Sequence, residues 1–114
     1  MTDCVFCRII AKTSPGEILY QDGLVTAFRD VHPIAPTHIL IVPNRHIASL
    51  NDLLPEDEAL VGHLFLTAKH LAFEEEIDRS GYRLILNTGP DAGQFIFHLH
   101  LHLIGGQRMR FMMG

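Results

Sequence analysis

Cysteine is scarce in this sequence, and long apolar runs and leader-like segments are missing from it. Its 114 residues include two cysteines, Cys4 and Cys7. No apolar run approaches the roughly 20 residues of a membrane-spanning helix, so we expect no membrane association. The first ten residues, MTDCVFCRII, contain no basic leader followed by an apolar core, which predicts a cytoplasmic location. Cysteines stay reduced there, so the pair favours a metal or redox role over a structural disulfide.

Positive charge is also in short supply. The chain has 9 Lys and Arg against 13 Asp and Glu, a net charge of -4. We therefore expect no nucleic-acid partner, because no basic stripe is available to displace the counterions of a phosphate backbone. No internal repeat, low-complexity segment or linker is visible, and 47% of the residues are hydrophobic. Residues 1–114 are predicted to form a single domain with its own core.

The most informative stretch is His98-Leu99-His100-Leu101-His102-Leu103-Ile104. Strict polar and apolar alternation is typical of a β-strand, in which successive side chains point to opposite faces. The leucines can then pack on a core, while the histidines share the other face at spacings of roughly 6.5–7 Å. Three imidazolium ions at that spacing would repel one another, so some should be neutral at pH 7. A neutral imidazole can act as nucleophile, base or metal ligand.

The other elements follow from turn signals, caps and periodicity, and together they predict an α+β fold. We expect one antiparallel sheet of about five strands, with one long and one short helix on one side. The predicted elements are a short helix capped by Asp3 and running to Ala11, a hairpin of Glu17–Tyr20 and Val25–Arg29 around Asp22-Gly23, a central strand His38–Pro43, a helix from Pro55 to about Glu76, and a strand Tyr82–Asn87 paired with the histidine strand.

Three further features carry less information. His63 and His70 lie two turns apart on the long predicted helix, where solvated positions explain them more simply than a ligand does. The loop of residues 88–94 contains two glycines and could present backbone N–H groups to an anion, or merely connect two strands. Phe111, Met112 and Met113 have no obvious core to enter, so we expect them to meet a second subunit or cover a pocket.

The two cysteines cannot close a tetrahedral zinc site by themselves, because such a site needs two more nitrogen or sulfur ligands. His46, just past the central strand, and His98, the first histidine of the row, are the pair that we favour. This choice leaves His100 and His102 free for chemistry. The alternative is that the cysteines pack as small reduced hydrophobes.

The histidine row resembles the His-φ-His-φ-His-φ-φ signature of the histidine triad (HIT) superfamily, in which φ is an apolar residue. The resemblance extends over nearly the whole chain, and the continuation Leu103-Ile104-Gly105-Gly106 is similar to the Hint branch of purine nucleoside phosphoramidases. Further stretches fall where that family has its motifs: Phe28-Arg29-Asp30-Val31, Pro36–Pro43, Asn44-Arg45-His46-Ile47, Asn87-Thr88-Gly89 and Gly93-Gln94.

The resemblance implies a hydrolase that cleaves the P–N bond of nucleoside 5'-phosphoramidates through a nucleotidyl-histidine, and a homodimer. His100 resembles the nucleophile, with His98, His102 and His38 as the other catalytic histidines. The phosphate site implied is Asn87, Gly93, Gln94 and His102, and the nucleoside site is Phe28, Arg29, Asp30 and Val31. Cys4, Cys7, His46 and His98 resemble the structural zinc site of bacterial members.

Two positions depart from the family pattern. Phe95 follows Gly93-Gln94 where a polar residue usually assists the leaving group, and a phenyl ring cannot donate a hydrogen bond. Arg29 replaces a residue that is often histidine in close relatives, which leaves adenine or guanine preference open. The alternatives are a dinucleoside polyphosphate hydrolase of another HIT branch, and a catalytically weak regulatory module that binds nucleotide or zinc.

Overall fold

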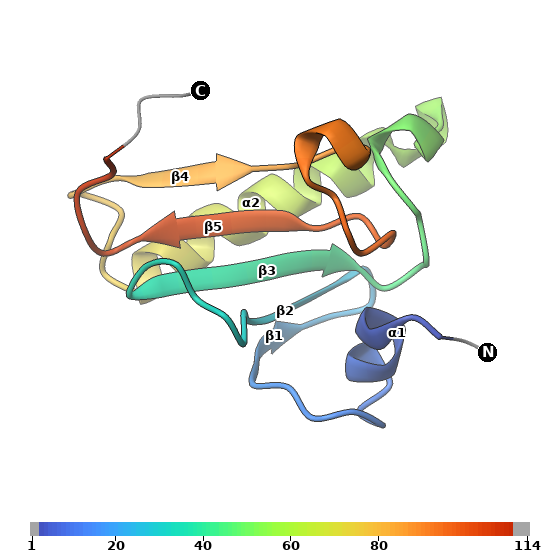
Figure 1. The fold of residues 1–114 in the computed structure, drawn as a ribbon, viewed down its shortest axis with the longest axis horizontal. Coiled ribbons are helices and arrows are strands. Elements are labelled where there is room, and N and C mark those ends of the chain that lie inside the picture. The colour runs from blue at the N-terminus through green and yellow to red at the C-terminus, as the bar shows by residue number, and fades with distance from the viewer. Residues whose placement is uncertain (1–2, 111–114) are drawn as a thin grey trace.

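The computed structural model describes residues 3–110, which form a five-stranded antiparallel sheet and two α-helices (Figure 1). The predicted residues Phe111, Met112 and Met113 lie outside the described range. No helix within residues 3–110 is long and apolar enough to cross a membrane. The elements are α1 (Val5–Ile10), β1 (Ile18–Gln21), β2 (Val25–Arg29), β3 (Thr37–Pro43), α2 (Glu58–Glu74), β4 (Tyr82–Ile85) and β5 (Leu101–Gly105), with short 3-10 helices at Leu50–Asp52, Pro55–Asp57 and Pro90–Ala92.

The strand order is β1-β2-β3-β5-β4, with every neighbouring pair antiparallel. β3 is buried along its whole length, as its nearly continuous apolar sequence predicts for a central strand. β5 pairs with both β3 and β4, so Leu40 lies opposite His102 and Ile39 opposite Leu103. The predicted five-stranded sheet and both predicted hairpins are therefore confirmed.

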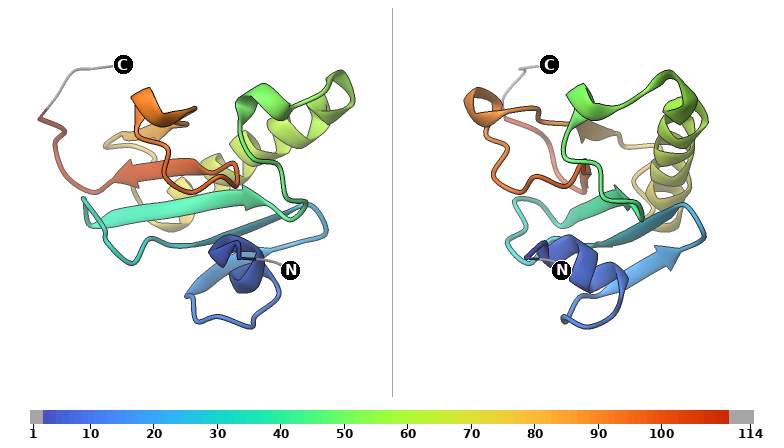
Figure 2. Two further views of the ribbon diagram at one scale, coloured as in Figure 1. Left: turned by 45° about the vertical axis from the view of Figure 1, so that its right-hand side comes forward. Right: turned by 90° about the vertical axis from the view of Figure 1, so that its right-hand side faces the viewer.

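The two helices cover opposite faces of the sheet (Figures 1 and 2). Leu64, Ala68 and Leu71 of α2 belong to the same buried cluster as Ile39 and Ile41 of β3. Phe6 and Ile9 of α1 instead pack with Phe28, Leu40 and Val42. Our prediction that both helices lie on one side is thus wrong. Because β2 and β3 are apolar on both faces, their sequence cannot show which face a short helix covers.

The histidine strand begins later than predicted, at Leu101 rather than at His98. Pro43 has no N–H for the ladder, and its carbonyl oxygen lies 2.8 Å from His98 Nε2. The N–H of Leu99 donates instead to the Ile47 carbonyl, at 2.7 Å. The alternation survives, because the intervening leucines are at most 1% exposed and belong to the α2 cluster.

Several boundaries also differ from the prediction. Cys4, not Asp3, caps α1, and its Sγ accepts a hydrogen bond from the Cys7 N–H at 3.3 Å. α2 begins at Glu58, because the residues from Pro55 to Asp57 form a separate 3-10 turn. Sequence patterns locate such ends only to within about two to four residues.

His63 and His70 prove to contact the β1–β2 hairpin. His63 Nε2 lies 2.7 Å from Oδ2 of Asp22, which also accepts from the Tyr20 hydroxyl at 2.6 Å. The rings of His70 and Tyr20 meet edge to face, with centroids 6.4 Å apart. These contacts tie α2 to the hairpin, so a structural role explains both histidines.

We expect Leu64→Ala to lower the free energy of unfolding by about 2–5 kcal/mol, because it removes a buried side chain and leaves a cavity. Leu64 is 1% exposed, whereas Leu66 on the same helix is 65% exposed. Leu66→Ala is therefore the matched control, with an expected loss below about 0.5 kcal/mol. Urea denaturation measures both, and equal losses would contradict the assignment of the core face.

Candidate active site and metal centre

His100 lies one residue before β5 and has its ring toward the face that α1 covers. Its Nδ1 lies 2.8 Å from the carbonyl oxygen of His98. Because a carbonyl oxygen only accepts, Nδ1 must carry the proton of this hydrogen bond. Neutral His100 therefore keeps its lone pair on Nε2, the nitrogen that can attack an electrophile.

His38 and His102 meet across the neighbouring strands β3 and β5. His38 Nε2 lies 2.9 Å from His102 Nδ1 and 3.4 Å from Oδ2 of Asp30. The Ile34 N–H donates to His38 Nδ1 at 3.2 Å, so neutral His38 carries its proton on Nε2 and donates it to His102. Neutral His102 must then carry its own proton on Nε2. One hydrogen-bond chain thus makes His102 a donor, while a second leaves His100 with a lone pair.

Burial keeps three of these histidines in the neutral form. The pKa of His102 is lowered to about 4, first by burial and then by the charges of His100 and His38. Burial also lowers the pKa of His38, an effect that Asp30 opposes. The pKa of His98 is lowered by burial as well. The proton positions deduced above for His38 and His102 therefore apply at neutral pH.

A cavity of about 250 Å³ opens beside His100 and His102. Phe28, Asp30 and Val31 line it, as expected for a predicted nucleoside site, although Val31 is 77% exposed. Apolar walls with a few polar groups are typical of small-molecule sites, which span roughly 300–1,000 Å³. The cavity is therefore close to the lower end of that range.

Arg29 borders this cavity, but its guanidinium is engaged elsewhere. Both of its terminal nitrogens donate to the carboxylate of Glu75, each at 2.9 Å, and Nε lies 3.4 Å from Glu17. Glu75 caps the C-terminal end of α2, on the other face of the sheet from α1. Since side chains alternate along β2, Phe28 faces the cavity side and the Arg29 head group does not.

The predicted phosphate residues Asn87, Gly93 and Gln94 are not part of the lining of this cavity among the described residues. The N–H groups of Gly93 and Gln94 donate to carbonyls within their own loop, each at 3.0 Å. The buried Gln94 amide accepts from the Gly89 N–H and donates to the Ala48 carbonyl, both at 2.9 Å. Gln94 thus braces the loop in this structure.

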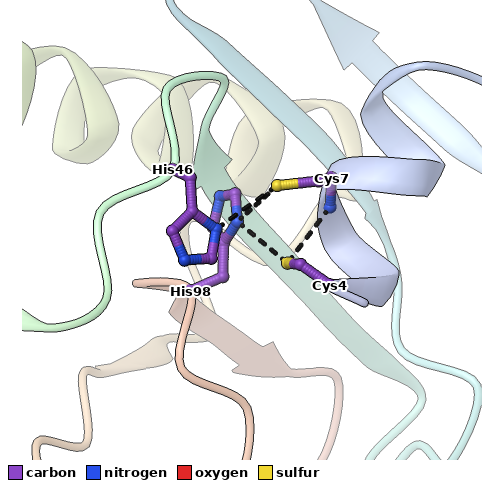
Figure 3. Close-up of side chains that lie close together, drawn as sticks. All are labelled: Cys4, Cys7, His46 and His98. Atoms are coloured by element: carbon purple, nitrogen blue, oxygen red, sulfur yellow. Dashed lines mark hydrogen bonds between the residues drawn. The ribbon is translucent and has the colours of Figure 1, made fainter. Parts of the chain in front are cut away.

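A second group of side chains, Cys4, Cys7, His46 and His98, comes together next to α1 (Figure 3). Cys4 and Cys7 of α1 face His46 and His98, and one ligand atom from each lies within 4.8 Å of the others. The sulfur-to-Nδ1 distances are 3.3 Å for Cys4 with His98 and 3.3 Å for Cys7 with His46. The predicted metal-binding set is therefore brought together by the fold.

The donors suit a tetrahedral metal ion. His98 Nε2–H donates to the Pro43 carbonyl at 2.8 Å, which leaves the Nδ1 lone pair directed at the cysteines. Metal–ligand bonds of about 2.0–2.3 Å place neighbouring ligands roughly 3.5 Å apart, close to the separations found here. Burial and then Cys4 raise the pKa of the Cys7 thiol to about 11, so a bound cation would displace a proton.

The spacing of Cys4 and Cys7 links α1 only to the metal-binding group. In the structure, this helix also lies against the cavity. Val5, Phe6 and Ile9 form part of the cavity wall. The i, i+3 spacing of Phe6 and Ile9 is the signal that one side of this helix is apolar. Phe6 and Ile9 line the cavity only because α1 covers this face of the sheet.

The sequence model of the HIT domain matches residues 11–109. The chain belongs to the HIT family. It is 48% identical over 105 residues to the purine nucleoside phosphoramidase of Escherichia coli K12, covering 92% of this chain and 88% of that protein. It is also 48% identical over 107 residues to an uncharacterized HIT-like protein of Synechococcus elongatus, covering 94% and 93%.

Solved HIT structures share this fold. The HIT family hydrolase of Legionella pneumophila superposes with a TM-score of 0.95 at 41% identity, over 98% of this chain and all of that one. A histidine triad protein of Clostridium difficile gives 0.94 at 38% identity, over 97% of this chain and 96% of that one. The predicted HIT family and fold class are thereby confirmed.

We expect acid to destabilise the fold through His102. Its pKa is about 4 when folded and near 6.5 when unfolded, so between these values the unfolded chain binds more protons. Unfolding free energy should therefore fall as the pH is lowered from about 6.5 to 4, and less steeply in His102→Gln. Urea denaturation across this range measures the slope, with His70→Gln as control. A His102 imidazole that titrates near pH 6.5 by NMR would contradict the expectation.

Proposed function

We propose that the protein hydrolyses purine nucleoside 5'-phosphoramidates, using His100 as nucleophile and adenosine or guanosine 5'-monophosphate as the transferred group. The observation that carries this proposal is the Nδ1–H bond from His100 to the His98 carbonyl, which leaves Nε2 unprotonated beside the cavity. The similarity to a purine nucleoside phosphoramidase supports the substrate class.

In the first step, the Nε2 lone pair of His100 attacks the phosphorus, and the P–N bond to the leaving amine breaks. The departing nitrogen takes up a proton from water. In the second step, water attacks the phosphorus of the nucleotidyl-histidine, the P–Nε2 bond breaks, and the proton released by the attacking water neutralises the hydroxide left by the first step. The products are the free amine and the nucleoside monophosphate, and His100 recovers its lone pair.

His102 would stabilise the charge that develops on the phosphoryl oxygens. Its Nε2–H is available for donation because Nδ1 already accepts from His38. Donors that are held in place before the reaction contribute more than donors that must reorient. His38 acts through His102, as a positioning residue.

The nucleoside and phosphate groups are assigned by their place around the cavity. Phe28 and Val31 would contact the base, and Asp30 would accept hydrogen bonds from the ribose hydroxyls. Arg29 would contribute through its backbone, since Glu75 holds its guanidinium. Asn87 would also contact the phosphate, whereas the N–H groups of Gly93 and Gln94 would do so only after exchanging loop carbonyls for phosphate oxygens.

His100→Ala is expected to lower turnover of a fluorogenic adenosine 5'-phosphoramidate by at least about 10⁴-fold, because the variant lacks the lone pair that attacks phosphorus. Binding of AMP should change by less than about tenfold. Steady-state kinetics and calorimetry measure the two quantities. Full activity of His100→Ala would disprove the nucleophile assignment.

Phe95 favours a second candidate function, a nucleotide-binding module with little turnover. Its ring is 88% exposed, and it occupies the position where the family usually has a polar leaving-group residue. Stoichiometric AMP binding without turnover in the wild-type chain would support this alternative. Turnover of diadenosine polyphosphates in preference to phosphoramidates would instead support another HIT branch.

We further propose that the Cys4, Cys7, His46 and His98 group binds zinc. Two sulfurs and two imidazole nitrogens are a set that zinc takes in closed structural sites. The metal would join α1 to the segments that follow β3 and precede β5. A homodimer, on the family resemblance, and a cytoplasmic location complete the proposal.

We expect the purified protein to contain about one zinc per chain and Cys4→Ser to lose it, because three ligands and a weak hydroxyl bind zinc poorly. The melting temperature of the wild-type chain should fall on chelation and recover with added zinc. Metal analysis tests the zinc content, with exposed His70→Ala as the control, and calorimetry of the wild-type chain tests the change in melting temperature. A zinc content unchanged in Cys4→Ser would refute the ligand assignment.

A further inference from the structure

The helix α1 belongs to two sites at once. Cys4 at its N-cap and Cys7 in its first turn face the histidines of the metal-binding group. Phe6 and Ile9 from the same six residues line the cavity beside His100. A displacement of this helix would therefore change both sites together.

Phe6 lies between the metal-binding group and the proposed nucleophile. Its ring is 4% exposed and meets three other rings edge to face. The ring centroids are 5.9 Å apart for His98, 5.2 Å for His100 and 5.2 Å for Phe28. Phe6 thus contacts a metal-binding residue, the nucleophile and the cavity wall at the same time.

A second connection runs through the backbone of His98. The Nδ1 of this residue faces the Cys4 and Cys7 sulfurs, at 3.3 and 3.5 Å. Its carbonyl oxygen accepts the Nδ1–H of His100 at 2.8 Å. His98, which would bind the metal through its ring, therefore also accepts the hydrogen bond that determines which nitrogen of His100 is free.

We propose that metal binding at Cys4, Cys7, His46 and His98 sets the nucleotide affinity of the cavity, and that Phe6 is the positioning residue through which it does so. The inference rests on the proposed nucleotide and zinc sites. It assigns the metal centre a regulatory effect on ligand binding in addition to a structural one.

The physical reason is the small size of α1. A six-residue helix has no stability of its own, so its position depends on what anchors it. With the metal, two ligands from α1 are bonded to two from the sheet side of the site. Without it, α1 retains its apolar packing but loses this anchor, and the wall made by Phe6 loosens. Coupling between two binding sites is reciprocal, so nucleotide should also tighten metal binding.

Calorimetry of AMP binding to the zinc-loaded and zinc-free chain tests the proposal. We expect the dissociation constant of AMP to rise about tenfold on zinc removal and to recover on zinc addition, within the usual range of such coupling. In Phe6→Leu, zinc should still bind, but its removal should change the AMP dissociation constant by less than about threefold. Phe73→Leu, at a ring on α2 that is 64% exposed, should behave like the wild type.

The outcomes separate this inference from the proposed function. AMP that fails to bind the zinc-loaded wild type would refute the nucleotide site itself. AMP that binds equally with and without zinc would refute only the coupling. A full zinc effect in Phe6→Leu would refute the role of Phe6.

Cobalt substitution gives a second readout that keeps the chain metal-loaded, and it decides the matter should the zinc-free chain unfold. We expect saturating AMP to shift the visible d–d bands of the Co²⁺-loaded wild type and Phe73→Leu. The shift should be at most about a third as large in Phe6→Leu. Bands unmoved by AMP in the wild type, or equally moved in all three proteins, would overturn the proposal.

Discussion

The hydrogen bond between His98 Nε2 and the Pro43 carbonyl is the interaction on which the site depends. It is buried, and it lies just beyond the last residue pair of the β3–β5 ladder, Ile41 with Leu101. It also directs the other nitrogen of His98 toward Cys4 and Cys7. With the ring held, the His98 carbonyl is in place to accept a hydrogen bond from the Nδ1–H of His100. One contact therefore orients both the metal-binding group and the proposed nucleophile.

The arrangement of donors and acceptors in the site also requires that the histidines be neutral, and burial favours the neutral form. A row of three exposed imidazoles would exchange protons freely near pH 6.5 and would have no settled donor or acceptor. Here His98 is fully buried and His38 is 5% exposed, so their charged forms are disfavoured. Each ring then has one protonated nitrogen, and its neighbour determines which one. The same sequence on an open strand would lack this definition.

Much of the fold could be predicted from the sequence. The alternation around Leu99 and Leu101 predicts the buried face of β5, and the apolar run before Pro43 predicts a central strand. The later start of β5 could not be predicted, because it depends on a ring from one segment occupying the carbonyl of another. Likewise, Cys4 rather than Asp3 caps α1, although Asp is generally preferred at this position. The Sγ of Cys4 accepts the hydrogen bond from the Cys7 N–H.

The site could be predicted in composition more readily than in arrangement. The spacing of Cys4 and Cys7 favours a metal-binding role. The row of three histidines on one strand, an uncommon pattern, indicates a catalytic or metal-binding site. The arrangement of Arg29 and Gln94 could not be predicted from the sequence. Their hydrogen-bond partners, Glu75 and Ala48 respectively, are each 46 residues away in sequence. A motif reports which side chains are present near a site but not which distant group already holds them.

The order of the amino acids alone predicts the strands, the long helix, and the histidines and cysteines that are candidates for metal binding and catalysis. These follow from local periodicity, spacing and residue chemistry. Only the tertiary structure decided that α1 covers the face opposite α2, that its Phe6 contacts His100, and that His100 presents Nε2 while His102 presents a donor. The reason is that a face, a ring contact and a proton position each depend on groups that folding brings together from distant parts of the chain.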